Sequence, residues 1–271
     1  MLRPLFILAA VASSTVPAVS HEFWIDPENH MLAPGDTMLA NLRVGQEYEG
    51  SSYSYIPDNF DRFEIAFEGD LSDVAGRVGD RPALNMAAPG EGLVVVVHET
   101  RDYELTYNEF QKFVDFVEHK DATEVIAAHR EMGLPETGFK EMYSRYAKSL
   151  IAVGNGEGQD RDMGLLTEIV ALENPYTGDV SDGVDVRLLY EGQPRSDAQI
   201  EIFEKAPDDA VVVTLIRTDA DGVATVPVRP GHRYMLDAVV LREVAPEMEE
   251  ITLAVWESLW ANLTFEVPAA E

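Results

Sequence analysis

The strongest constraint on the fold is a succession of short runs with the two-residue period of a β-strand, separated by glycine and proline. The runs "TMLANLRVG" and "RFEIAFEG" alternate apolar and polar residues, whereas "GLVVVVHET" is continuously apolar. Alternation indicates a strand with one solvent-facing side, and a short continuous run indicates a strand buried on both faces. Strands at this close spacing predict a mostly β protein built from β-sandwiches.

The hydrophobic period changes after Leu105. The run "TYNEFQKFVDFVEHK" places apolar side chains at helical spacing, with Thr106 as an N-cap and Glu109 at the capping-box position. A second helix is predicted in "DATEVIAAHREMG", ended by Gly133, and a third in "GFKEMYSRYAKSL", before the strand "SLIAVG". We therefore expect a helical insertion around residues 106–150.

The segment "NPYTGDVSDG" is rich in turn residues and poor in apolar ones, which is typical of a domain boundary. We expect an N-terminal β-sandwich domain at residues 21–177, which carries the helical insertion, and a second sandwich at residues 178–271. The second segment contains "YEGQPRSDAQIEIF", "TDADGVATVPV" and "PGHRYMLDAVV", and this arrangement resembles the prealbumin-like or Cna-B-like β-sandwich modules.

Two aspartates in the second segment have a spacing that also occurs in calcium loops. Asp219, Asp221 and Gly222 suit an Asx-type turn with one residue at positive φ. The rest of the segment does not supply the oxygen ligands that a calcium loop requires. We therefore interpret these residues as turn formers.

The first twenty residues have the pattern of a secretory signal. One basic residue, Arg3, precedes an apolar run, and Ala18 and Ser20 are the small residues required before the cleaved bond. The apolar run is too short to span a bilayer. We expect residues 1–20 to be removed, leaving a periplasmic chain that begins at His21 and does not insert into a membrane.

The chain has 49 acidic against 20 basic residues, a net charge of −29, and no cysteine. This charge argues against nucleic acid and anionic membranes as partners, because basic patches supply those interactions. It is compatible with cations, although scattered carboxylates also serve simply to keep a protein soluble. The absence of cysteine leaves histidine, carboxylate, methionine and backbone nitrogen as the possible metal ligands.

A histidine at a mature N-terminus has a specific chemical capacity. The α-amine and the ring Nδ1 of His21 lie at chelating distance within one residue, and the amine loses its proton at little cost near neutral pH. A second histidine would complete a three-nitrogen site, called a histidine brace, that suits Cu(II) or Ni(II). The alternative is that cleavage merely tolerates histidine here and that the following Phe23 and Trp24 provide packing.

The second ligand must come from another histidine. We predict His98, because it follows the apolar run "LVVVV" near the end of a strand. His232, in the turn "PGHRY", is a further candidate metal ligand. Roles for His30, His119 and His129 stay open.

The mature chain as a whole resembles a known family. The segments that carry the resemblance are "HEFWIDP", "LVVVVHET", "LTYNEFQKFVDF", "YSRYAKSLIAVG", "TEIVALENPY" and "WESLWANLTFEV". The resemblance extends over nearly all of residues 21–267. The chain is similar to a family of domains of unknown function once labelled NikM-like, whose members are described as periplasmic nickel-uptake or cobalt-transport components. The resemblance implies handling of a transition metal such as nickel or cobalt in the periplasm, and the brace chemistry adds copper. We expect a metal ion as ligand and an inner- or outer-membrane transporter as a further partner.

Other functional classes have weaker support in the sequence. It contains no G-x-S-x-G elbow, phosphate-binding loop or dinucleotide fingerprint, so an enzyme is the less favoured interpretation. A copper brace with an open coordination position could still carry out oxidation. The chain could also be a non-metal interaction module of the cell envelope. In such a module, Trp256 and Trp260, four residues apart, would be exposed anchors for a partner or glycan. The alternative is that one or both are buried and fill the seam between the two domains.

Overall fold

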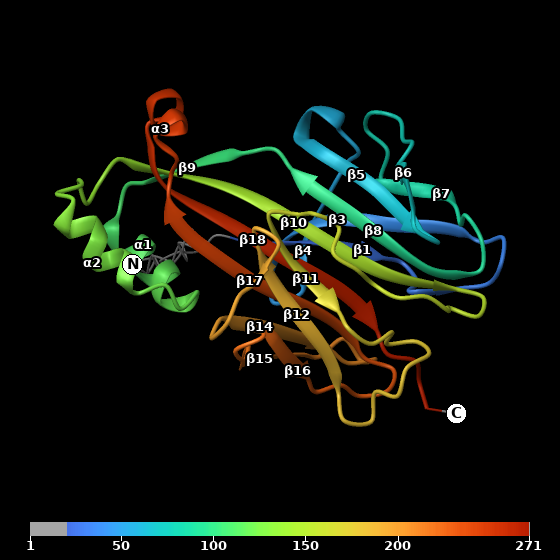
Figure 1. The fold of residues 1–271 in the computed structure, drawn as a ribbon. Coiled ribbons are helices and arrows are strands. Elements are labelled where there is room, and N and C mark those ends of the chain that lie inside the picture. The colour runs from blue at the N-terminus through green and yellow to red at the C-terminus, as the bar shows by residue number, and fades with distance from the viewer. Residues whose placement is uncertain (1–20, 271) are drawn as a thin grey trace, which may run out of the picture.

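The computed structural model describes residues 21–270 (Figure 1). The predicted signal peptide, residues 1–20, lies outside this range. The described chain is mostly β, as the strand patterns predict, and contains three sheets. No helix within the described residues is long and apolar enough to cross a membrane.

A ten-stranded central sheet runs through the whole molecule. Its main path is β15 (Val211–Arg217), β14 (Gln199–Lys205), β17 (Arg233–Glu243), β18 (Ala254–Glu266), β10 (Phe139–Val153), β8 (Gly92–Thr100), β5 (Phe60–Phe67) and β6 (Asp70–Asp73). Two short strands, β2 (Met31–Leu32) and β9 (Tyr103–Tyr107), also pair with β10. The parallel pair β10–β18 joins a strand from the middle of the sequence to the last strand of the described chain.

Two four-stranded sheets pack on opposite faces of the central sheet. The first contains β1 (Glu22–Pro27), β3 (Thr37–Gln46), β4 (Glu49–Tyr53) and β7 (Leu84–Ala87). The second contains β11 (Thr167–Ala171), β12 (Val184–Tyr190), β13 (Gln193–Pro194) and β16 (Val223–Val226). Strand β8 shows the two faces, because Val94 and Val96 pack toward the first small sheet whereas Val95 and Val97 pack toward the second. The prediction that this run is buried on both faces is confirmed.

The helices are short. Helices α1 (Phe110–His119) and α2 (Glu124–Glu131) cover one end of the face that also carries β1, whereas α3 (Pro246–Thr252) packs against Met142, Val244 and Ala254; a 3₁₀ turn lies at Pro57–Asn59. In Figure 1, α1 and α2 lie at the left, away from β1 and β3. We call this side of the central sheet the helix face. Trp256 and Trp260 of β18 lie under α1, 2% and 1% exposed, so they fill a seam and are not exposed anchors.

The predicted helical insertion at residues 106–150 is partly wrong. Thr106 does not cap a helix; it lies in β9, and α1 begins at Phe110 after an N-cap residue, Glu109, that makes no side-chain capping bond. The second predicted helix is confirmed as α2, with Gly133 at positive φ just beyond its end.

The third predicted helix is also wrong, because "GFKEMYSRYAKSL" forms most of β10. Nearly all of β10 is buried, and both of its faces carry polar side chains whose partners come from distant segments. The apolar residues of this segment therefore do not show the two-residue period of a strand. Phe139, Met142 and Tyr146 happen to lie at helical spacing, and this spacing led to the wrong prediction of a helix.

The turn interpretation of Asp219 is confirmed. Its side-chain Oδ1 accepts hydrogen bonds from the backbone N–H groups of Asp221 and Val223, each at 2.9 Å. Gly222 adopts the positive φ of 72° that this turn requires. The carboxylate thus serves the β-turn before β16.

The boundary expected at residues 177 and 178 lies between β11 and β12. These strands pair with each other over five residues, from Thr167↔Tyr190 to Ala171↔Val186. The central sheet also contains strands from both segments. The division into two domains stays a prediction, and the hydrogen-bonded sheets are continuous across it.

Candidate functional site

Strand β1 lies across the helix face of the central sheet. Thr264 of β18 donates a hydrogen bond from Oγ1 to the backbone oxygen of Ile25 at 2.8 Å, which holds β1 against the sheet. Successive side chains of β1 point to opposite sides, as strand geometry requires. Phe23 and Ile25 enter the core formed with β5 and β8, whereas Glu22 points to the region below α1.

His98 lies near the end of β8 in an aromatic cage. Its ring centroid is 5.0 Å from that of Phe23, 5.3 Å from that of Phe60 and 5.1 Å from that of Phe63. The residue is 2% exposed, and its Nδ1 atom is buried without a hydrogen-bond partner. Burial lowers the pKa of His98 to about 3, so the imidazole is neutral at neutral pH.

His21 is half-buried immediately before β1, and its Nδ1 atom also lacks a hydrogen-bond partner. Its backbone oxygen accepts a hydrogen bond from Nη2 of Arg145 at 3.1 Å. The guanidinium of Arg145 lies 6.0 Å from the ring of Phe23, and the same ring contacts His98. Phe23 thus contacts both His98 and Arg145, and Arg145 in turn contacts the backbone of His21.

A buried ionic cluster lies on the other side of β1. The Nζ atom of Lys120, which follows α1, is 2.5 Å from Glu201, 3.1 Å from Asp237 and 3.5 Å from Glu22. His119 adds an Nε2 contact of 2.8 Å to Glu201. All three carboxylates and Lys120 are at most 5% exposed. This Lys120 cluster joins α1, β1, β14 and β17 at one point.

The cluster strongly perturbs its members. Burial raises the pKa of Glu22 to about 7 against the opposing effect of Lys120, and burial also raises the pKa of Asp237. Burial alone would lower the pKa of Lys120, but the three carboxylates outweigh it and raise that pKa. Lys120 is therefore the internal counter-ion of the three carboxylates, and it occupies the position that a metal ion would need there.

His232 lies apart from this region. It precedes β17, and its Nδ1 atom is 2.8 Å from Oε1 of Glu204. His232 lies five residues before Asp237 in the chain, which corresponds to roughly 16 Å at the rise of an extended strand. Asp237 and Glu22 share a contact with Lys120, and Glu22 is the residue after His21. His232 therefore lies at a different place along the sheet from His21.

The other three histidines have partners of their own. The ring of His30 donates from Nδ1 to the backbone oxygen of Leu150 at 3.0 Å. His129 accepts a hydrogen bond at Nδ1 from Nε1 of Trp256 at 2.9 Å, and His119 belongs to the Lys120 cluster. Each of these rings therefore has at least one partner within the fold, although the buried Nε2 atom of His30 has none.

Within residues 21–270, no three histidine, aspartate or glutamate side chains converge as a ready-made metal cage. A histidine brace needs only two imidazoles, because the terminal amine supplies the third nitrogen. The two unpartnered Nδ1 atoms of His21 and His98 fit that requirement, since a buried polar atom without a partner is costly unless it meets one.

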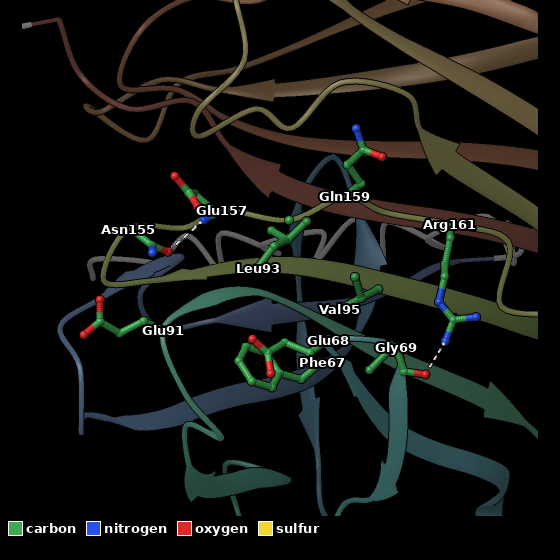
Figure 2. Close-up of a pocket in the computed structure, with 12 residues that line it drawn as sticks. Phe67, Glu68, Gly69, Glu91, Leu93, Val95, Asn155, Glu157, Gln159 and Arg161 are labelled. Atoms are coloured by element: carbon green, nitrogen blue, oxygen red, sulfur yellow. Dashed lines mark hydrogen bonds between the residues drawn. The ribbon is translucent and has the colours of Figure 1, made fainter.

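A separate surface cavity of about 450 Å³ lies between the β5–β6 turn, the start of β8 and the loop after β10 (Figure 2). Its rim carries Glu68, Glu91 and Glu157, and Arg161 donates to the backbone oxygen of Gly69 at 3.3 Å. These charged side chains are exposed, and none of the described histidines lines the cavity.

Sequence reasoning missed Arg145 and Lys120. Both lie in segments that read as helix with charged, solvent-facing positions, "YSRYAK" and "FVEHK". Nothing local distinguishes them from ordinary surface residues. The only sequence signal is Glu22, the second residue after the predicted cleavage site, which is an acid directly before the apolar residues Phe23, Trp24 and Ile25.

Comparison with protein families matches residues 18–242 to a domain of unknown function, DUF4198. A search of curated proteins gives no match. The family match agrees with the resemblance to a domain of unknown function and carries no statement about nickel or cobalt. Because it spans most of the sequence, including every strand from β1 to β16 and most of β17, the chain belongs to the DUF4198 family.

Proposed function

We propose that the mature chain, freed of residues 1–20, binds a divalent transition metal in the periplasm. The metal is nickel, cobalt or copper, and it is carried as cargo for uptake, delivery or sensing. His21 supplies its α-amine and Nδ1, and His98 supplies the second imidazole. The observation that carries the proposal is the pair of buried, unpartnered Nδ1 atoms of His98, which packs against Phe23, and of His21, which lies two residues before Phe23 in the chain.

In this proposal the two ligands have different tasks. The phenylalanine cage around His98 fixes its ring and excludes water, as a rigid ligand requires. His21 is only partly buried, so a cation could reach and leave it from solvent. Such an arrangement suits a carrier that hands its cargo to a membrane transporter, in keeping with the NikM-like resemblance.

Metal titration of two chains tests this function. One chain begins at His21 and the other has one additional residue before it, so that its α-amine is displaced. We expect one-to-one binding of Ni(II), Co(II) or Cu(II) to the first chain by calorimetry, with Zn(II) for comparison and spin resonance for copper. The additional residue should remove most of the affinity. Equal binding by both chains would contradict the role of the amine.

Three substitutions separate the histidines. His21→Ala should abolish most binding, and His98→Leu, which preserves an apolar cage, should weaken it on the order of 10–100-fold or more. His232→Gln is the matched control, because the His232 ring contacts Glu204 and lies about 16 Å along β17 from Asp237, the member of the Lys120 cluster on that strand. A loss of affinity in His232→Gln equal to that in His98→Leu would exclude the proposed pair.

A non-metal interaction module of the cell envelope is the second candidate. The cavity of about 450 Å³ with its polar rim is the feature that favours it. It becomes the leading function if the correctly processed chain binds none of the metals. Copper-dependent oxidation is the third candidate, and it requires turnover of a reductant and O₂ by the Cu(II)-loaded chain.

A further inference from the structure

Arg145 is a buried cation without a matching anion. It is 8% exposed, its Nε atom has no hydrogen-bond partner, and no ion pair within residues 21–270 includes it. Its Nη2 atom donates only to the backbone oxygen of His21. A guanidinium removed from water normally has a carboxylate or phosphate partner, because burial of an uncompensated charge is costly.

Aromatic rings surround this guanidinium and lead to the surface. It lies 4.7 Å from the centroid of Tyr143, which stacks on Tyr103 at 5.5 Å. Phe23 lies on another side at 6.0 Å. Tyr103 and Tyr143 are half-buried, and the nearby Tyr53 is 47% exposed. A planar guanidinium held against aromatic rings presents its remaining N–H groups in the fork that matches a carboxylate.

The same residue contacts the proposed metal ligand His21, which creates an electrostatic conflict. A fixed positive charge beside the site repels a bare divalent cation, and low local dielectric strengthens that repulsion. An organic acid that ligates the metal turns this repulsion into attraction, because one of its carboxylates can bind the cation while another pairs with Arg145. Arg145 contacts the backbone oxygen of His21, so a metal-bound acid at His21 would have the guanidinium close by.

We propose that Arg145 binds a free carboxylate of an organic acid that chelates the metal, so that the substrate is a metal–polycarboxylate complex rather than the bare ion. This inference rests on the proposed metal-binding function and names its substrate class. Tyr143 and Tyr103 form the wall against which the acid lies. No covalent step is involved; the chelate enters and leaves intact.

Calorimetry of the chain that begins at His21 tests the inference. The three titrants are Ni(II) alone, an equimolar Ni(II)–citrate complex, and citrate alone. We expect the complex to bind at least about tenfold more tightly than Ni(II) alone, a difference that one charge-assisted bidentate pair can supply. Citrate alone should bind weakly, because it gains Arg145 but no metal.

Variants at Arg145 identify the residue responsible. Arg145→Gln should bind Ni(II) as well as or better than the wild type and should lose the preference for the complex. Arg145→Lys retains the charge without the fork and should recover only part of the preference. Circular dichroism checks folding, and Tyr143→Leu, which removes the aromatic wall, gives a second test if Arg145→Gln does not fold.

The outcomes separate the two proposals. If citrate merely competes for Ni(II), in the wild type and in Arg145→Gln alike, the inference fails while the metal function stands. If no titrant containing metal binds, the proposed function fails. Arg145-dependent binding of citrate that is indifferent to metal would overturn the chelate inference, because the site would then recognise a free organic acid.

Discussion

At the residue scale, burial decides the charge state of several side chains. Glu141 of β10 is fully buried, and it accepts hydrogen bonds from the hydroxyl groups of Tyr107 at 2.8 Å and Ser258 at 2.5 Å. Burial nevertheless raises the pKa of Glu141 from 4.5 to about 7. His30 has the opposite response, because burial lowers its pKa from 6.5 to about 4.

Glu141 should make the protein less stable as the pH rises from about 4.5 to about 7. In that window the folded state retains a proton that the unfolded state has lost, so the free energy of unfolding decreases by about 3 kcal/mol. Glu141→Gln removes this titration. Urea unfolding at several pH values should therefore show a flatter profile for the variant, and parallel profiles would contradict the assignment.

At lower pH, His30 should make the free energy of unfolding change with pH in the opposite direction. Below about 6.5 the unfolded state binds a proton that the folded state does not bind until about pH 4, so stability decreases as the pH falls through that window. The expected loss is about 3 kcal/mol. His30→Asn keeps a short N–H donor for the oxygen of Leu150 and should reduce the acid sensitivity. The check is the free energy of unfolding of both proteins at pH 6.5 and pH 4.5; an equal fall in both would remove His30 as the source.

At the element scale, β10 combines structural and functional roles in one strand. It carries Glu141, Arg145 and Lys148, and all three are buried. Lys148 contacts Asp160 at 2.8 Å and Glu168 at 2.8 Å, so it attaches the loop after β10 to the sheet. The composition of "GNGEGQDRDMG" is typical of an exposed loop, but the ion pair with Lys148 holds Asp160 of this loop against the core.

Lys148→Met should be strongly destabilising. It leaves Asp160 and Glu168, whose side chains are at most 1% exposed, as buried charges without a counter-ion. Removing one partner of such a pair costs about 3–5 kcal/mol. The matched control is Arg130→Ala, which breaks an ion pair with Glu136 whose side chains are about 60% exposed; that change should stay within about 0.5 kcal/mol. Thermal or urea unfolding measures both, and equal effects would contradict the buried pairing.

At the scale of the whole molecule, the central sheet contains strands from both sides of the predicted domain boundary. Strand β18, near the C-terminus, pairs with β10 in parallel from Lys140↔Ala254 to Ser149↔Thr264. On its other edge it pairs with β17 along eleven residues, from Arg233↔Glu266 to Glu243↔Trp256. Trp256 and Trp260 are covered by helices from the N-terminal segment. Separation of the segments would expose these indoles and one edge of β18.

A fragment of residues 178–271 should therefore not fold by itself. It lacks β10 and α1, so the helix face of β17 and β18 would be solvent-exposed, and the unpaired edge of β18 would favour aggregation. The full mature chain should unfold in one cooperative transition. Circular dichroism and gel filtration of the fragment provide the measurement. A monomeric, native-like fragment would establish the boundary at residues 177 and 178 as a folding boundary.

Local patterns in the sequence determined part of this structure. The alternating and continuous apolar runs predicted the mostly β class and the doubly buried strand at residues 92–100, because side-chain period and burial follow directly from strand geometry. The Asp219 turn was predictable for the same reason: an Asx turn is closed by groups within a few residues of each other. The candidate metal ligands His21 and His98 were also named from local cues, and their role stays a prediction.

Only the tertiary structure decided the features that depend on distant partners. A lysine or arginine within an apparent helix face looks solvent-exposed until strands far away in the sequence place carboxylates or tyrosines around it. Lys120 and Arg145 are buried only because β1 packs against the central sheet that contains β10, β14 and β17. The strand β10 was misread for the same physical reason, because its burial comes from non-local pairing that overrides local periodicity.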